Sequence, residues 1–175
     1  MARPLFFYDV GSPWCWLAAE RVGGGPEWVP VRVRSAQTAA VDRAAIEQRA
    51  VREGLLQVRW PEPFPFDSRV AMLAATFAKH AGRGVAYSLA AMRQAFTAGR
   101  DLAVVDNVLI AAAACELHPR AVLKGIEARA VAEALDRASE RAAALGVSEL
   151  PALTDGDEVV AGPRLLDSEL FQSSG

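Results

Sequence analysis

The chain has 175 residues and a formal net charge of −2 at pH 7, with 52% hydrophobic and 23% charged residues. This length suits one domain, or one domain with an insertion, and the composition supports a sizeable core. The charge gives no basic footprint of the kind that nucleic-acid binding requires. We therefore expect no nucleic-acid partner.

Membrane, disulfide and metal features are also missing from the sequence. No apolar run approaches the roughly 18 residues that span a bilayer, and no secretory signal follows Met1. Two cysteines, Cys15 and Cys115, are too few for a disulfide scaffold. His80 and His118 have no further ligands at metal spacing. We expect a cytoplasmic protein with no membrane segment and no metal.

The first 35 residues are typical of a strand–helix–strand unit. An apolar, aromatic run over residues 4–10 predicts a buried strand, and residues 13–22 have a helical pattern. Glycines and a proline at 23–26 break the chain, and residues 28–34 alternate apolar and polar side chains as a second strand does. Such a unit implies parallel pairing of its two strands.

The middle of the chain changes to helical patterns. Residues 39–56 favour a helix, whereas three prolines between residues 60 and 66 exclude one there. Further helical patterns cover residues 69–81, 85–98, 104–117, 119–125 and 128–145. Gly146 is suited to end the last of these helices.

The end of the chain returns to strand patterns. Residues 151–154 and 158–161 flank Asp-Gly-Asp, a hairpin turn signal, and residues 165–171 favour a short helix. The layout predicts an α/β domain built from residues 1–35 and 119–175. Residues 36–118 would form an inserted, all-helical subdomain.

The turn at residues 12–15 is the most informative motif. Pro13 suits the first helical turn, which places Ser12 at the N-cap. Free N–H groups and the helix dipole favour negative charge at that point. The spacing Ser-Pro-Trp-Cys is that of Cys-x-x-Cys with serine in the attacking position. Cys15 therefore cannot complete a dithiol–disulfide cycle with Ser12.

Four segments carry a resemblance to a known family. They are Phe-Tyr-Asp-Val-Gly-Ser-Pro-Trp-Cys-Trp-Leu at 7–17, Phe-Asp-Ser at 66–68, Gly-Arg-Asp-Leu at 99–102 and Gly-Val-Ser-Glu-Leu-Pro-Ala-Leu at 146–153. Their order resembles the DsbA-like thioredoxin fold with a helical insertion. Within that fold, they are similar to 2-hydroxychromene-2-carboxylate isomerases and kappa-class glutathione transferases.

The resemblance implies a site for a small thiol cofactor, either glutathione or another low-molecular-weight thiol. Ser12 would contact the thiol sulfur, the backbone of Leu150 would pair with the cysteinyl unit, and the Leu150–Pro151 bond would be cis. The chain departs from the family pattern at residues 162–165, where a carboxylate usually holds the γ-glutamyl amine. The complete predicted thiol site consists of Ser12, Pro13, Trp14, Leu150, Pro151, Arg164 and Asp167.

A substrate pocket is predicted beside this site. Trp14, Phe64 and Phe66 offer flat apolar surfaces next to the polar Asp67, an arrangement suited to a small aromatic substrate. With the resemblance, this indicates a thiol-dependent isomerase or transferase acting on an aromatic unsaturated acid. Ser12 would be its main catalytic residue.

Two other functions stay open. Cys15 is expected to be a half-buried packing residue, but as a reactive single thiol it would instead make the protein a DsbA-like oxidoreductase. A catalytically idle thioredoxin-fold protein that only binds a ligand or partner is the other alternative. Many proteins of the resembling families are dimers, so a homodimer is also open.

Overall fold

A four-stranded mixed sheet lies at the centre of the computed structural model, which describes residues 3–172. The strand order is β2-β1-β3-β4. β1 (Leu5–Tyr8) pairs in parallel with β2 (Glu27–Pro30) and antiparallel with β3 (Ala152–Thr154). β3 pairs antiparallel with β4 (Val159–Ala161). The two ends of the chain therefore build one sheet, and the expected α/β class is confirmed.

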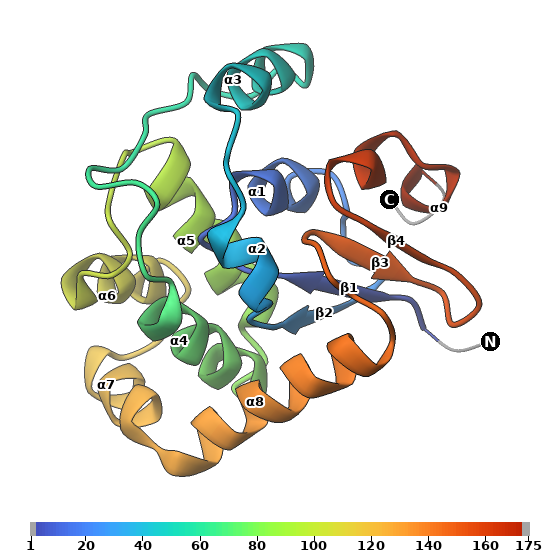
Figure 1. Cartoon of the computed structure of the whole chain (residues 1–175). Helices are drawn as coiled ribbons and strands as arrows, with labels where there is room; N and C mark the ends of the chain where they lie inside the picture. Colours follow the sequence, from blue (N-terminus) through green and yellow to red (C-terminus); the bar gives the residue numbers. More distant parts are fainter. Residues whose placement is uncertain (1–2, 173–175) are drawn as a thin grey trace.

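Helices fill the chain between the two halves of the sheet. α1 (Pro13–Ala19) connects β1 to β2. In Figure 1, α4 to α7 gather on one side of the sheet, and α8 runs back toward β3, contacting β2. The bounds of the long connection are α2 (Arg34–Thr38), α3 (Arg43–Arg52), α4 (Arg69–His80), α5 (Gly84–Phe96), α6 (Val105–Ala113), α7 (Pro119–Glu127) and α8 (Arg129–Ala144).

Several predicted elements differ from the structure: the helix predicted over 13–22 ends at Ala19, the one predicted over 104–117 ends at Ala113, and α2 was not predicted. The second strand ends at Pro30 rather than at residue 34, because its partner β1 ends opposite it at Tyr8. The helix expected over 39–56 begins at residue 43, where the Asp42 side chain accepts the Ala45 N–H at 3.1 Å. The expected C-terminal helix is a 3₁₀ helix, η1 (Pro163–Asp167), and a separate α9 (Glu169–Gln172).

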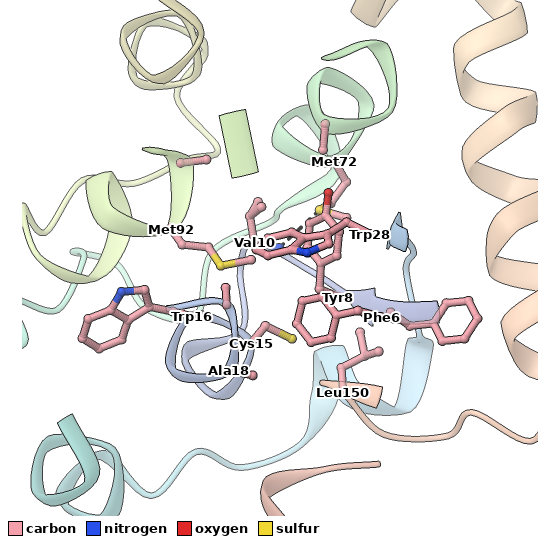
Figure 2. Packing of buried hydrophobic residues seen from close by; sticks show 14 of the residues in the cluster. Phe6, Tyr8, Val10, Cys15, Trp16, Ala18, Trp28, Met72, Met92 and Leu150 are labelled. Atoms are coloured by element: carbon pink, nitrogen blue, oxygen red, sulfur yellow. Dashed lines mark hydrogen bonds between the residues drawn. The ribbon is translucent and has the colours of Figure 1, made fainter. Parts of the chain in front are cut away.

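The core is built around β1. The side chains of Phe6, Phe7 and Tyr8 are wholly buried, and the Phe6 ring lies edge-on to Trp28 of β2 with ring centroids 5.1 Å apart. The Tyr8 hydroxyl shares a 2.6 Å hydrogen bond with Ser88 of α5. Figure 2 shows this packing from close by. The contacts fix the end of β1, and with it the turn that follows.

Between residues 3 and 172, no helix has both the length and the apolar character needed to cross a membrane. The division of the chain into a domain at 1–35 and 119–175 and an insertion at 36–118 stays a prediction.

Candidate functional site

The turn from β1 into α1 has the predicted geometry. Ser12 is the N-cap, and its Oγ accepts the Cys15 N–H at 3.2 Å, as Pro13 opens the helix. The Ser12 N–H in turn donates to the Asp9 carbonyl oxygen at 3.1 Å. Because Oγ acts as acceptor toward the helix, the hydroxyl proton can be donated to a ligand.

A cavity of about 850 Å³ opens above this turn. Five separate segments line it: the turn into α1, the segment around α2 between residues 32 and 41, the proline-rich segment before α4, the residues just before β3, and Pro163 at the start of η1. It brings together most of the site residues predicted from sequence, namely Ser12, Pro13, Trp14, Phe64, Phe66, Asp67 and Leu150.

An aromatic cluster supports one wall of the cavity. The Phe64 ring lies 6.2 Å from that of Phe66, 4.9 Å from that of Trp60 and 6.0 Å from that of Phe96 in α5. Each of these aromatic contacts stabilises the wall and orients its rings. Phe64 and Phe66 are half-buried, so they pack inward and still face the cavity.

The segment before β3 has the backbone form that the resemblance implied. The Leu150–Pro151 bond is cis, and Leu150 lines the cavity. Pro151 is buried, and its carbonyl oxygen accepts the Gly162 N–H at 2.8 Å. This bond ties the segment to the loop after β4.

Cys15 does not reach the cavity. Its exposed fraction is 0%, so the expectation of half-burial is wrong. The side chain belongs to the hydrophobic cluster drawn in Figure 2. Burial raises the pKa of its thiol to about 12, against smaller opposing effects of the Ser12 side chain and the Asp9 backbone. A neutral thiol that is buried away from solvent is poorly suited to nucleophilic chemistry.

Two predicted thiol-binding residues are engaged elsewhere. The Asp167 carboxylate pairs with Arg49 of α3 at 2.9 Å, and Arg164 Nε donates to the Ala161 carbonyl oxygen at 3.1 Å. Neither residue lines the cavity, although Pro163 beside them does. The structure gives their predicted role no support.

Asp9 is a cavity residue to which the sequence analysis gives no role. Only 5% exposed, it accepts hydrogen bonds from Gly11 N at 2.8 Å and from Ser68 Oγ at 3.0 Å. Burial raises the pKa of this carboxyl, and these two hydrogen bonds oppose the rise. A Cβ on Gly11 would lie 2.9 Å from the Ser68 Cβ, so glycine permits this close approach.

Arg32 and Glu149 also line the cavity and were missed. Arg32 follows β2, where the sequence shows only an alternating strand pattern, and its side chain donates to Asp67 at 2.9 Å. No local motif singles out either residue. Their proximity results from the sheet order, which places the end of β2 and the start of β3 on either side of β1.

Several features of the cavity match what a small thiol ligand needs. The cavity volume, the N-cap hydroxyl of Ser12 and the backbone before a cis proline are features that would receive a thiol and its peptide unit. Within residues 3–172, no three His, Cys, Asp or Glu side chains are grouped as a metal site requires. The Ser12 hydroxyl and the backbone at Leu150 are chemically compatible with a thiol ligand.

Comparisons with solved structures find the same fold. A 2-hydroxychromene-2-carboxylate isomerase superposes with a TM-score of 0.80 at 16% identity, covering 94% of this chain and 91% of the other. A probable DsbA oxidoreductase from Streptomyces coelicolor gives 0.75 at 17% identity, covering 98% and 89%. The cytosolic disulfide reductase DsbM from Pseudomonas aeruginosa, solved with GSH, gives 0.62 at 16% identity, covering 90% and 87%.

A search of curated protein sequences returned no significant match. The sequence does match a family, the DSBA-like thioredoxin domain, over residues 5–169. This range includes every strand of the sheet and the cavity-lining residues. The chain therefore belongs to the DSBA-like thioredoxin domain family.

Proposed function

We propose that this protein is a thiol-dependent isomerase or transferase that acts on an aromatic unsaturated acid, with glutathione or a similar small thiol as cofactor. The observation that carries the proposal is the contrast between two neighbouring residues. Ser12 lines the cavity at the start of α1, whereas Cys15, one turn on, is sealed in the core. The cavity thus has a binding position for a thiol at Ser12, and the protein has no reactive thiol of its own at that position.

The first-turn residues would stabilise a thiolate. The Ser12 hydroxyl can donate one hydrogen bond, and the N-terminal end of α1 adds a favourable dipole. The backbone at Leu150 would position the peptide part of the cofactor. When bound, the thiol supplies a nucleophilic sulfur that adds reversibly to an electrophilic carbon and so permits bond rotation.

The aromatic wall would hold the substrate. Trp14, Phe64 and Phe66 present flat apolar surfaces that match an aromatic ring. Holding the substrate ring at a fixed distance from the thiol bound at Ser12 would raise the reaction rate, because the reacting atoms would already be oriented. Support comes from the likeness to a 2-hydroxychromene-2-carboxylate isomerase, and GSH is present in the structure of the DsbM neighbour.

An assay of 2-hydroxychromene-2-carboxylate isomerisation tests this proposal. The reaction is monitored by absorbance, with and without reduced glutathione. We expect isomerisation that needs the thiol, falls at least tenfold in Ser12→Ala, and persists in Cys15→Ala. The proposal is wrong if Ser12→Ala keeps full activity on a substrate that the wild type converts. Loss of isomerisation in Cys15→Ala with the fold intact would also overturn the proposal, because it would mean that Cys15 itself takes part in the reaction.

A further inference from the structure

Arg32 places a positive charge inside the cavity. It lies between β2 and α2, and its backbone N–H donates to Ser139 Oγ of α8 at 3.0 Å. Its side chain is 21% exposed and lines the cavity together with the aromatic residues. A guanidinium that is largely withdrawn from water beside apolar surface needs compensating partners.

Only part of the charge and hydrogen-bonding capacity of the Arg32 guanidinium is matched by protein partners. Nη2 donates to Asp67 Oδ1 at 2.9 Å, and the same oxygen accepts the Arg69 N–H at 2.9 Å. Nε is buried and has no hydrogen-bond partner among residues 3–172. Asp67 is 68% exposed, so water screens much of its charge. Arg32 therefore retains donors that its one acidic partner does not use.

The other acid close to Arg32 does not supply the missing bonds. Asp9 is buried beside the cavity, but its two carboxylate oxygens accept from Gly11 N and Ser68 Oγ. Arg32 lowers the pKa of Asp9 only as a minor effect against the larger rise from burial. Nε is buried and closed to a ligand, so the donors that a ligand in the cavity can reach are the N–H groups of Nη1 and Nη2 that the bond to Asp67 leaves unused.

We infer that Arg32 binds the carboxylate of an acidic aromatic ligand whose ring lies against Trp14, Phe64 and Phe66. A guanidinium forms strong, charge-assisted hydrogen bonds to carboxylates and matches their planar shape. The inference rests on the proposed function for the reaction, and it adds the residue that selects an acid over a neutral analogue. Asp67 is then a positioning residue that holds Nη2 until the ligand arrives.

Cinnamate and cinnamamide are suitable probes, because they share an aromatic ring and a double bond but differ in charge. Calorimetric titration of the wild type should show cinnamate binding about tenfold or more tightly than cinnamamide, as expected for a charge-assisted hydrogen bond. Arg32→Gln should remove that preference. Arg52→Gln, which loses the same charge from the exposed end of α3 outside the cavity, should keep it.

A second variant keeps the test informative if Arg32→Gln does not fold. Asp67→Asn retains an oxygen that can accept the Arg69 N–H but removes the competing charge from Arg32. We expect it to increase the preference for cinnamate over cinnamamide. Circular dichroism and the Tm of each variant verify the fold before titration.

The inference is overturned if the wild type binds both probes equally or neither of them, if Arg32→Gln keeps the preference, or if Asp67→Asn lowers it. Titration of the wild type with reduced glutathione reports separately on the proposed function. A cinnamate preference without glutathione binding refutes only the thiol-dependent reaction. Glutathione binding without the preference refutes only the role of Arg32.

Discussion

Alkylation of Cys15 should be very slow in the folded protein. Burial raises the pKa of this thiol to about 12, whereas an ordinary cysteine has a pKa of about 8.5, so its thiolate fraction at neutral pH is lower by roughly three orders of magnitude. Only the thiolate reacts with iodoacetamide. Since Cys15 is also wholly buried, its rate should fall at least a thousandfold below that of free cysteine.

The measurement uses a Cys115→Ala background, in which Cys15 is the one remaining thiol. Mass spectrometry follows carbamidomethylation as the pH is raised, and the rate should still be rising at the highest pH at which the fold persists. Guanidinium-unfolded protein gives the rate of the accessible thiol. Ser12→Cys combined with Cys15→Ala in the same background is the matched control, because its one thiol lies at the cavity and at the start of α1, where it should react fast.

A rate that levels off below about pH 8 would refute this reasoning, because it would mean that Cys15 has a pKa at or below that of an ordinary thiol. The single-thiol oxidoreductase would then become the better interpretation of the site. Fast labelling of both the background protein and the control would likewise show that Cys15 is accessible.

Two further predictions concern the floor of the cavity. Gly11→Ala should lower the free energy of unfolding by about 1–3 kcal/mol in urea, because the new Cβ would clash with Ser68. Gly24→Ala, with open space around it, is the matched control. Equal stability of the two variants would contradict the prediction. Asp9→Asn should gain stability relative to the wild type as the pH rises above about 4, because burial raises the pKa of Asp9 and ionising it in the fold costs more than in the unfolded chain. A difference in Tm between the two proteins that stays constant from acid to neutral pH would contradict this sign.

The parts of the site that could be predicted from the sequence depend on local chemistry. The N-cap at Ser12 follows from a small polar residue before a proline, and it is confirmed. The cis bond at Leu150–Pro151 came from the resemblance alone and is also confirmed. The N-cap is determined by a few adjacent residues, whereas the cis bond was inferred from the resemblance and not from local chemistry.

The parts that could not be predicted depend on distant contacts. The second strand ends at Pro30 because β1 ends at Tyr8, which a pattern within residues 28–34 does not reveal. For the same reason, no sequence pattern indicates that Arg32 contacts Asp67, 35 residues away. The prediction that Cys15 is half-buried was wrong, because helices from the middle of the chain pack against α1. One of them, α5, contacts α1 directly.

The central claim is that Ser12 receives a thiol at the start of α1. Calorimetric titration with reduced glutathione, for the wild type and Ser12→Ala, tests it most directly, with S-methylglutathione as the ligand that lacks a free thiol. We expect the wild type to bind glutathione and Ser12→Ala to bind it about tenfold more weakly, since one hydrogen bond to a charged sulfur is lost. S-methylglutathione should not distinguish the two proteins. Equal glutathione affinity in both proteins, or no binding to the wild type, would contradict the account.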